Sequence, residues 1–192
     1  MKAIVLLTVL LTVSGLTVLL GAIKTRDIHS ASGVNDTSII AGYRNWTLVN
    51  PEPVKMLAPV AILCAPVTQV MADGEKGNPH RDKFISVYVN DVGKRAMLIE
   101  LQPHFPKGSI IVKQKLTTKS ATDPELLTVM IKRDAEFDPS NGDWEYMVFD
   151  GTGKTVQAQG KLENCQSCHL RVKDTDYVNR TYLPKDVRQK LQ

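Results

Sequence analysis

The sequence predicts an α+β domain built mainly from antiparallel strands, with a few short helices. Segments of alternating, β-rich residues recur between about residues 84 and 160, and clusters of turn-forming residues separate them. The long helical periodicity of a bundle is absent, and no internal repeat or low-complexity run appears. The 192 residues are 43% hydrophobic and 23% charged, which suits one domain of ordinary size with a core of its own.

At least five strands and one or two helices are expected between residues 40 and 160. The first strand covers residues 84–90, and Asn90 with Asp91 then caps a short helix over residues 91–101 that ends near Pro103. Residues 105–109 form a turn, residues 138–143 a loop, and residues 150–153 a hairpin turn. The remaining strands are residues 110–116, 125–134, 143–150 and 154–160.

The N-terminal segment predicts export. Residues 3–23 contain no charged side chain, and at about 1.5 Å per residue such a helix could just cross a bilayer. We therefore expect residues 1–30 to be a signal peptide or an N-terminal membrane anchor. Residues 31–192 then form the folded domain in the periplasm or another extracytoplasmic compartment.

The charge pattern argues against a nucleic-acid partner. The formal net charge is +4, and the lysines and arginines are scattered, without a run of five or more.

A short motif near the C-terminus indicates the cofactor. Residues 163–169 read ENCQSCH, and Cys165, Cys168 and His169 form a C-x-x-C-H motif. A structural zinc site commonly uses two cysteine pairs, but the chain has only three cysteines, and Cys64 reads as a buried thiol. A redox dithiol does not need the histidine. The motif is the attachment signature of a c-type haem, in which two thiols bind the haem vinyl groups and the histidine is the proximal iron ligand.

The segment after the motif bears on the sixth iron ligand. No Met or His follows His169, so such a ligand must come from upstream. The upstream candidates are His80, His104, Met71, Met97, Met130 and Met147. The histidines lie in polar or proline-rich turns and the methionines suit a core, so we expect an open sixth position that binds a small molecule.

Several segments, in order, carry a resemblance to a known family. They read AGYRNW (41–46), FISVYVN (84–90), FPKGSIIVKQ (105–114), WEYMVFD (144–150) and DYVNRTYLP (176–184). Together with the leader and the late C-x-x-C-H motif, they resemble the cytochrome P-460 family and its relatives, the cytochromes c′-beta. The resemblance extends from about residue 40 to residue 184.

The resemblance implies a function and an additional haem bond. Cytochromes P-460 oxidise hydroxylamine, and in them a strand lysine bonds to the haem macrocycle. The position that matches is Lys113, with Lys115 as the alternative two residues on, and strand alternation puts both on the face of Ile111. The c′-beta relatives lack this bond and bind gases. Three functions stay open: oxidation of hydroxylamine or nitric oxide, binding of nitric oxide or carbon monoxide without turnover, and simple electron transfer.

Hydroxylamine oxidation also needs a base near the iron. The family's distal carboxylate matches Leu162, or Glu163 if the loop register shifts by one residue. Arg44 is a candidate for the pocket or for a haem propionate. The resemblance further implies a homodimer, and an oxidoreductase of this kind needs a redox partner protein.

Overall fold

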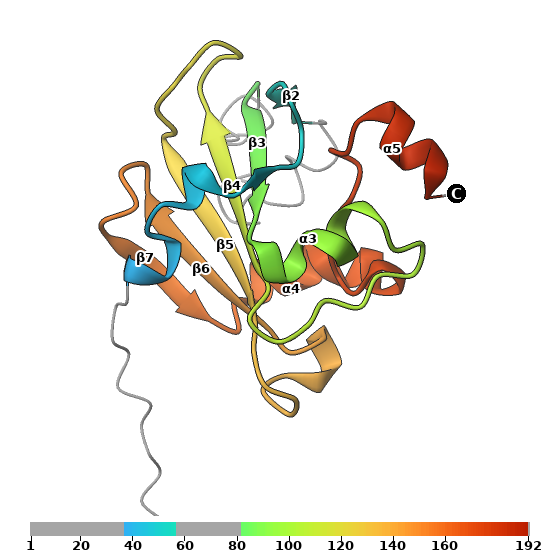
Figure 1. Cartoon of the computed structure of the whole chain (residues 1–192). Coiled ribbons are helices and arrows are strands. Elements are labelled where there is room, and N and C mark those ends of the chain that lie inside the picture. Colours follow the sequence, from blue (N-terminus) through green and yellow to red (C-terminus); the bar gives the residue numbers. More distant parts are fainter. Residues whose placement is uncertain (1–36, 57–81, 192) are drawn as a thin grey trace, which may run out of the picture. The chain divides into compact units, whose positions relative to one another are not determined.

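A seven-stranded antiparallel sheet forms the centre of the fold (Figure 1). The structure, a computed structural model, describes residues 37–56 and 82–191. The sheet order is β1-β3-β4-β5-β6-β7, and β2 also pairs with β3. The strands are β1 (Thr47–Leu48), β2 (Val54–Lys55), β3 (Phe84–Val89), β4 (Ile110–Leu116), β5 (Leu126–Lys132), β6 (Trp144–Asp150) and β7 (Val156–Gly160).

The helices are short, and most of them lie near the ends of the described chain. They are η1 (Thr37–Ile40), η2 (Tyr43–Asn45), α3 (Asp91–Leu98), η4 (Pro139–Asn141), α4 (Glu163–His169), η5 (Leu170–Thr175) and α5 (Lys185–Lys190). The predicted α+β class, with a mainly antiparallel sheet and a few short helices, is therefore confirmed.

Asn90 begins α3 as predicted. Its side-chain oxygen accepts the N–H of Gly93 at 3.1 Å and that of Ile110 at 3.0 Å, so one residue caps the helix and ties it to the start of β4. The helix ends at Leu98, three residues before the predicted end. Proline disfavours the helical conformation in the residue before it, and Pro103 and Pro106 follow closely.

Other elements also differ from the prediction: β3, β5 and β6 are one to three residues shorter than expected. The two-residue strands β1 and β2 were not expected, because they are too short to show alternation. β7 begins at Val156 rather than at residue 154, because the hairpin turn is longer than four residues. Its closing bond runs from the Asp150 N–H to the Thr155 carbonyl.

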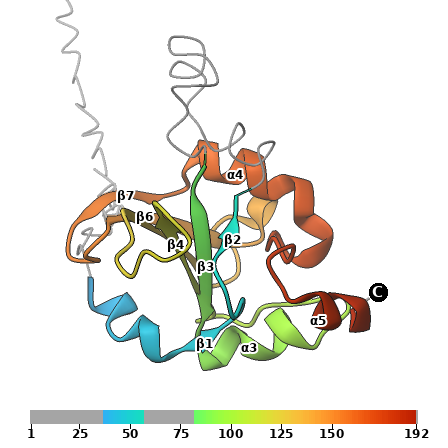
Figure 2. The same cartoon turned by 90° about the horizontal axis from the view of Figure 1, so that it is seen from above.

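Strand alternation gives the sheet two different faces. On one face, Ile111, Met130 and Tyr146 are neighbours across β4, β5 and β6. They belong to a core cluster with Met97 of α3, and Cys165 of α4 packs against this cluster. On the other face, a second cluster includes residues of η1 and η2. It consists of Ile40, Tyr43, Val112, Leu127, Val129, Ile131, Met147 and Phe149. Figure 2 shows these two short helices, in blue, on the side of the strands away from α5.

Within the described ranges, none of the helices is long and apolar enough to cross a membrane. The predicted leader, residues 1–30, lies outside the described residues, as do Cys64, Met71 and His80.

Candidate haem site

α4 carries the C-x-x-C-H motif. Cys165 lies three residues before Cys168 and four before His169, so a helix brings all three side chains to one side. Gln166, between the cysteines, donates its amide N–H to the carboxylate of Asp138 at 2.6 Å. This bond ties α4 to the loop around η4, so the orientation of the helix is fixed by a residue within the motif.

One cavity brings the motif together with the sheet. It has a volume of about 370 Å³, within the usual range for ligand pockets, and it is lined by Cys165, Cys168 and His169. The facing sheet contributes Ile111, Lys113, Lys115, Thr128, Met130, Tyr146 and Val148. The cavity thus holds two thiols, an imidazole and two lysines within a mainly apolar wall.

His169 has the tautomer and the protonation state that a metal ligand requires. Its Nδ1 lies 2.7 Å from the backbone carbonyl oxygen of Tyr177, which can only accept a hydrogen bond. Nδ1 therefore carries the proton, and Nε2 keeps the lone pair that a metal needs. Removal from water lowers the pKa of His169 to about 4, the Tyr177 carbonyl opposes that shift, and the charge of Lys113 adds to it. The imidazole is neutral at ordinary pH, which is the form that binds metals.

The two lysines of β4 differ in their surroundings. Lys115 forms an ion pair with Glu125, from Nζ to Oε1 at 3.0 Å, and Glu125 also binds Lys83 at 2.6 Å. The positive charge of Lys113 is one of the causes that lower the pKa of His169. Of the two, Lys113 is therefore the one associated with the haem motif.

Tyr146 stands out as a buried polar group in this cavity. Its ring centroid lies 5.3 Å from that of His169, and its hydroxyl is buried without a hydrogen-bond partner among the described residues. Burial raises the pKa of Tyr146, so the phenol stays protonated and can donate. A buried donor without a partner is costly, and it fits a cavity that receives a polar group of a cofactor or its ligand.

Glu163 and Leu162 lie elsewhere. Glu163 is the first residue of α4, and its side chain is exposed. Leu162 precedes the helix and packs partly buried against the first core cluster. Neither residue is part of the cavity wall, so the structure brings no carboxylate to the place that the register argument predicted.

Arg44 is also remote from the cavity. It is exposed in η2, where it donates to the carbonyl of Thr122 at 3.2 Å and approaches Asp123 at 4.0 Å. Its neighbour Tyr43 belongs to the cluster on the opposite face of the sheet and bonds to Gln114 there. The geometry therefore does not support Arg44 as a pocket or propionate residue.

The described candidates for the sixth ligand lie in different parts of the fold. His104 is exposed, and its backbone N–H binds Glu100. Met97 and Met130 are buried in the first core cluster and line the cavity. Met147 packs in the cluster on the opposite face, although it also contributes to the cavity lining.

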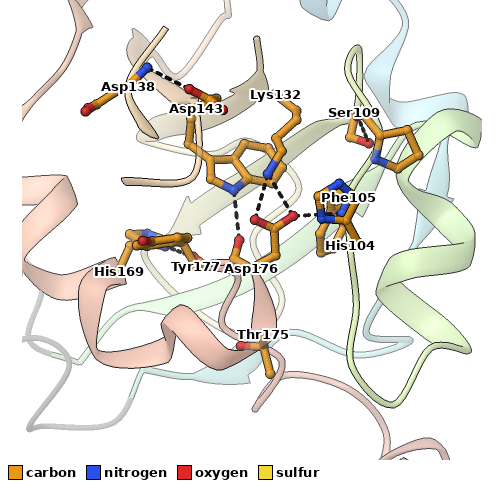
Figure 3. Close-up of polar contacts among 12 residues, drawn as sticks. His104, Phe105, Ser109, Lys132, Asp138, Asp143, His169, Thr175, Asp176 and Tyr177 are labelled. Carbon is orange, nitrogen blue, oxygen red and sulfur yellow. Dashed lines mark hydrogen bonds and ion pairs between the residues drawn. The ribbon is translucent and has the colours of Figure 1, made fainter. Parts of the chain in front are cut away.

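Sequence reasoning missed the residues that hold His169. Tyr177 accepts the imidazole proton, and it follows Asp176, which forms an ion pair with Lys132 (Figure 3). Tyr177 follows His169 by eight positions, and Asp176 lies 44 positions from Lys132, so neither contact follows from helix or strand spacing. The only available signal was the segment after the motif, where Asp176 and Tyr177 begin the DYVNRTYLP stretch.

The donor set fits a c-type haem. Two thiols and a neutral histidine line one cavity of suitable size, next to a buried hydroxyl that has no partner in the described part of the chain. A search of curated proteins found no match. The family model "Cytochrome P460" matches residues 40–180, a range that includes every strand of the described residues and the motif on α4. The chain therefore belongs to the cytochrome P460 family, and its cofactor is a haem.

Proposed function

We propose that this protein is an exported mono-haem c-type cytochrome whose iron has an open sixth position for hydroxylamine or nitric oxide. One observation carries the proposal: the two thiols, the neutral His169 and Lys113 line the same cavity. When bound, the haem supplies a redox-active iron with a coordination position for a small ligand.

Cys165 and Cys168 would attach the cofactor, and His169 would bind the iron. Each thiol would hold the haem as a thioether, formed by adding sulfur to one vinyl carbon and the thiol hydrogen to the other. His169 would bind the iron through Nε2, with its Nδ1–H held by the Tyr177 carbonyl. The open sixth position is tested by adding carbon monoxide to the ferrous protein. A rapid spectral change supports the open position. A low-spin spectrum that does not change when carbon monoxide is added would favour electron transfer, with Met97 or Met130 as the sixth ligand.

Lys113 is the proposed site of an additional bond to the macrocycle. The Glu125 carboxylate engages Lys115, whereas Lys113 is electrostatically coupled to His169. The bond replaces one N–H and one C–H, so its formation requires a two-electron oxidant such as peroxide. Lys113→Met should abolish the far-red band of the ferrous protein that such a bond produces. Lys115→Met, the matched control, should retain it.

Peptide mapping distinguishes the two lysines directly. Trypsin does not cut after a lysine whose amine is blocked. A bond at Lys113 therefore leaves haem on the peptide 108–115, and a bond at Lys115 leaves it on the peptide 114–119. Haem on neither peptide would refute the cross-link and favour the gas-binding alternative.

A second candidate function is ligand binding without turnover. Oxidation of hydroxylamine requires removal of protons from its nitrogen, and no Asp or Glu is found among the described residues that line the cavity. Glu163 remains the nearest carboxylate in sequence, but its side chain is exposed. We therefore infer that any hydroxylamine oxidation is slow.

The role of Glu163 is decided by hydroxylamine oxidation with an artificial electron acceptor. A slower reaction in Glu163→Ala identifies this residue as the base, in a conformation other than the one seen here. An unchanged rate removes it from the mechanism and supports binding of nitric oxide or carbon monoxide as the function.

The location and partners follow from the same proposal. We propose export to the periplasm, either released or anchored by residues 1–30, with a redox partner protein and a homodimeric state. Cell fractionation and size-exclusion chromatography of the haem-loaded protein test the location and the dimer. A cytoplasmic or monomeric protein would contradict the corresponding part.

A further inference from the structure

A buried ion pair lies behind the haem motif, outside the cavity wall. Lys132, the last residue of β5, donates to both carboxylate oxygens of Asp176, at 2.6 Å and 2.8 Å. Each side chain is only 9% exposed. Removing two charges from water to this depth costs free energy, and a contribution to solubility does not explain why the pair is present.

Asp176 is held by two further bonds, which come from different parts of the chain. The Phe105 N–H donates to its carboxylate at 2.8 Å, and the Trp144 indole N–H donates to its backbone carbonyl at 2.8 Å (Figure 3). The Lys132 ammonium also lies 5.0 Å from the centre of the Trp144 ring, within range of a cation–π interaction. Residues from β5, β6 and the segment after α3 thus converge on one aspartate.

These contacts support an unusual backbone conformation. Asp176 and Tyr177 both have left-handed φ angles, 51° and 62°. Residues other than glycine keep this conformation only where surrounding contacts impose it. The consequence is the orientation of the Tyr177 carbonyl, which accepts the Nδ1–H of His169 at 2.7 Å.

We propose that Asp176 is a positioning residue for His169. Its ion pair with Lys132 fixes the turn at residues 176–177, and the turn fixes the hydrogen bond that sets the orientation and basicity of the imidazole. The proposal rests on the proposed function in one respect, which is that His169 is the iron ligand.

The physical effect has a definite sign. A hydrogen bond from Nδ1–H to a carbonyl makes Nε2 a stronger donor to iron. A stronger donor favours the ferric state and strengthens the iron–histidine bond. Loosening the turn should therefore raise the reduction midpoint potential and lower the iron–histidine stretching frequency of the ferrous protein.

The variants distinguish the effect of the Asp176 charge from the effect of its side-chain shape. Asp176→Asn keeps the size of the side chain, its tolerance of the left-handed conformation and an acceptor for Phe105, and it removes the charge that pairs with Lys132. A buried ammonium without its partner endangers folding, so Lys132→Met/Asp176→Asn removes both charges together. Lys132→Arg is the conservative replacement, because arginine can pair with the same carboxylate.

A matched control is present on the same two strands. Glu145 of β6 is buried and binds Arg133, which follows β5, and neither residue lines the cavity. Glu145→Gln removes the charge of a buried carboxylate, whose arginine partner is 36% exposed, without touching the segment that holds His169. A general loss of stability should affect this variant too, but it should not change the iron–histidine bond.

The test is resonance Raman spectroscopy and redox titration of the haem-loaded proteins. We expect Asp176→Asn and the double variant to show a lower iron–histidine frequency and a higher midpoint potential. Lys132→Arg and Glu145→Gln should match the wild type. If the Asp176 variants retain haem with wild-type frequency and potential, the positioning role is refuted while the haem assignment stands. A wild-type protein without histidine ligation would refute both.

Discussion

The hydroxyl of Tyr146 is expected to destabilise the haem-free protein. It is buried against the His169 ring, and no described residue accepts its proton or donates to it. Tyr146→Phe deletes this oxygen and leaves the ring in place. The haem-free form of the protein should therefore become more stable when this residue is changed.

The magnitude follows from the burial. A buried polar group without a partner costs about 1–3 kcal/mol, and Tyr146 is 3% exposed. We expect Tyr146→Phe to increase the free energy of unfolding by about 1 kcal/mol, which corresponds to a rise in Tm of about 2–4 °C for a chain of this size.

Tyr43 provides a control of opposite sign. It is also buried in the sheet core, but its hydroxyl accepts a hydrogen bond from the side-chain amide of Gln114 at 2.8 Å. Tyr43→Phe leaves that amide without its partner and should lower the free energy of unfolding by about 1–3 kcal/mol.

The assay is urea unfolding of the haem-free protein, made with both motif cysteines changed to alanine and followed by circular dichroism. The two variants should shift the midpoint in opposite directions without changing the slope. If Tyr146→Phe destabilises as much as Tyr43→Phe, the hydroxyl has a partner before haem binds. Its role as a donor reserved for the cofactor site would then be refuted.

Two further predictions concern turns. Asp150 accepts hydrogen bonds in the last hairpin, first from the Thr152 hydroxyl, and they lower its pKa to about 2. A lowered carboxylate pKa stabilises the fold above about pH 4, and this contribution is lost as the pH falls toward 2. Unfolding midpoints of Asp150→Asn should thus depend less on pH between 4 and 2 than those of the wild type, and an equal dependence would contradict this. Gly142 has a φ of 64°, and a Cβ added there would lie 2.5 Å from Cδ2 of Tyr177. Gly142→Ala should therefore lower the free energy of unfolding, measured by urea titration, by about 2–4 kcal/mol. A wild-type unfolding midpoint would contradict this packing.

The parts of the fold that could be predicted depend on local patterns. Alternation helped to identify β3 to β7, because successive side chains of a strand point to opposite faces of the sheet. The same alternation put Lys113 on the face of Ile111, and both residues line the cavity. Asn90 was predicted as a helix cap because its side chain bonds within its own segment.

The rest of the site depends on contacts between distant residues. The ion pair of Lys132 with Asp176 spans 44 positions. The left-handed turn that it supports contains no glycine, which is the residue that would have indicated it in the sequence. The position of Glu163 depends on where α4 begins, and a shift of one residue turns a side chain by about 100° around a helix. Arg44 could not be assigned to a face, because 3-10 helices as short as η2 show no periodicity.

The central claim is that Cys165 and Cys168 attach the haem and that His169 binds its iron. The most direct test is the intact mass of the denatured protein after acid–acetone extraction, followed by tryptic mapping. We predict that one haem stays on the chain and is found on the peptide 162–171, which contains the whole motif. Changing both cysteines to alanine should release it, unless a bond at Lys113 retains it on the peptide 108–115. A wild-type chain that loses its haem on extraction would contradict the account.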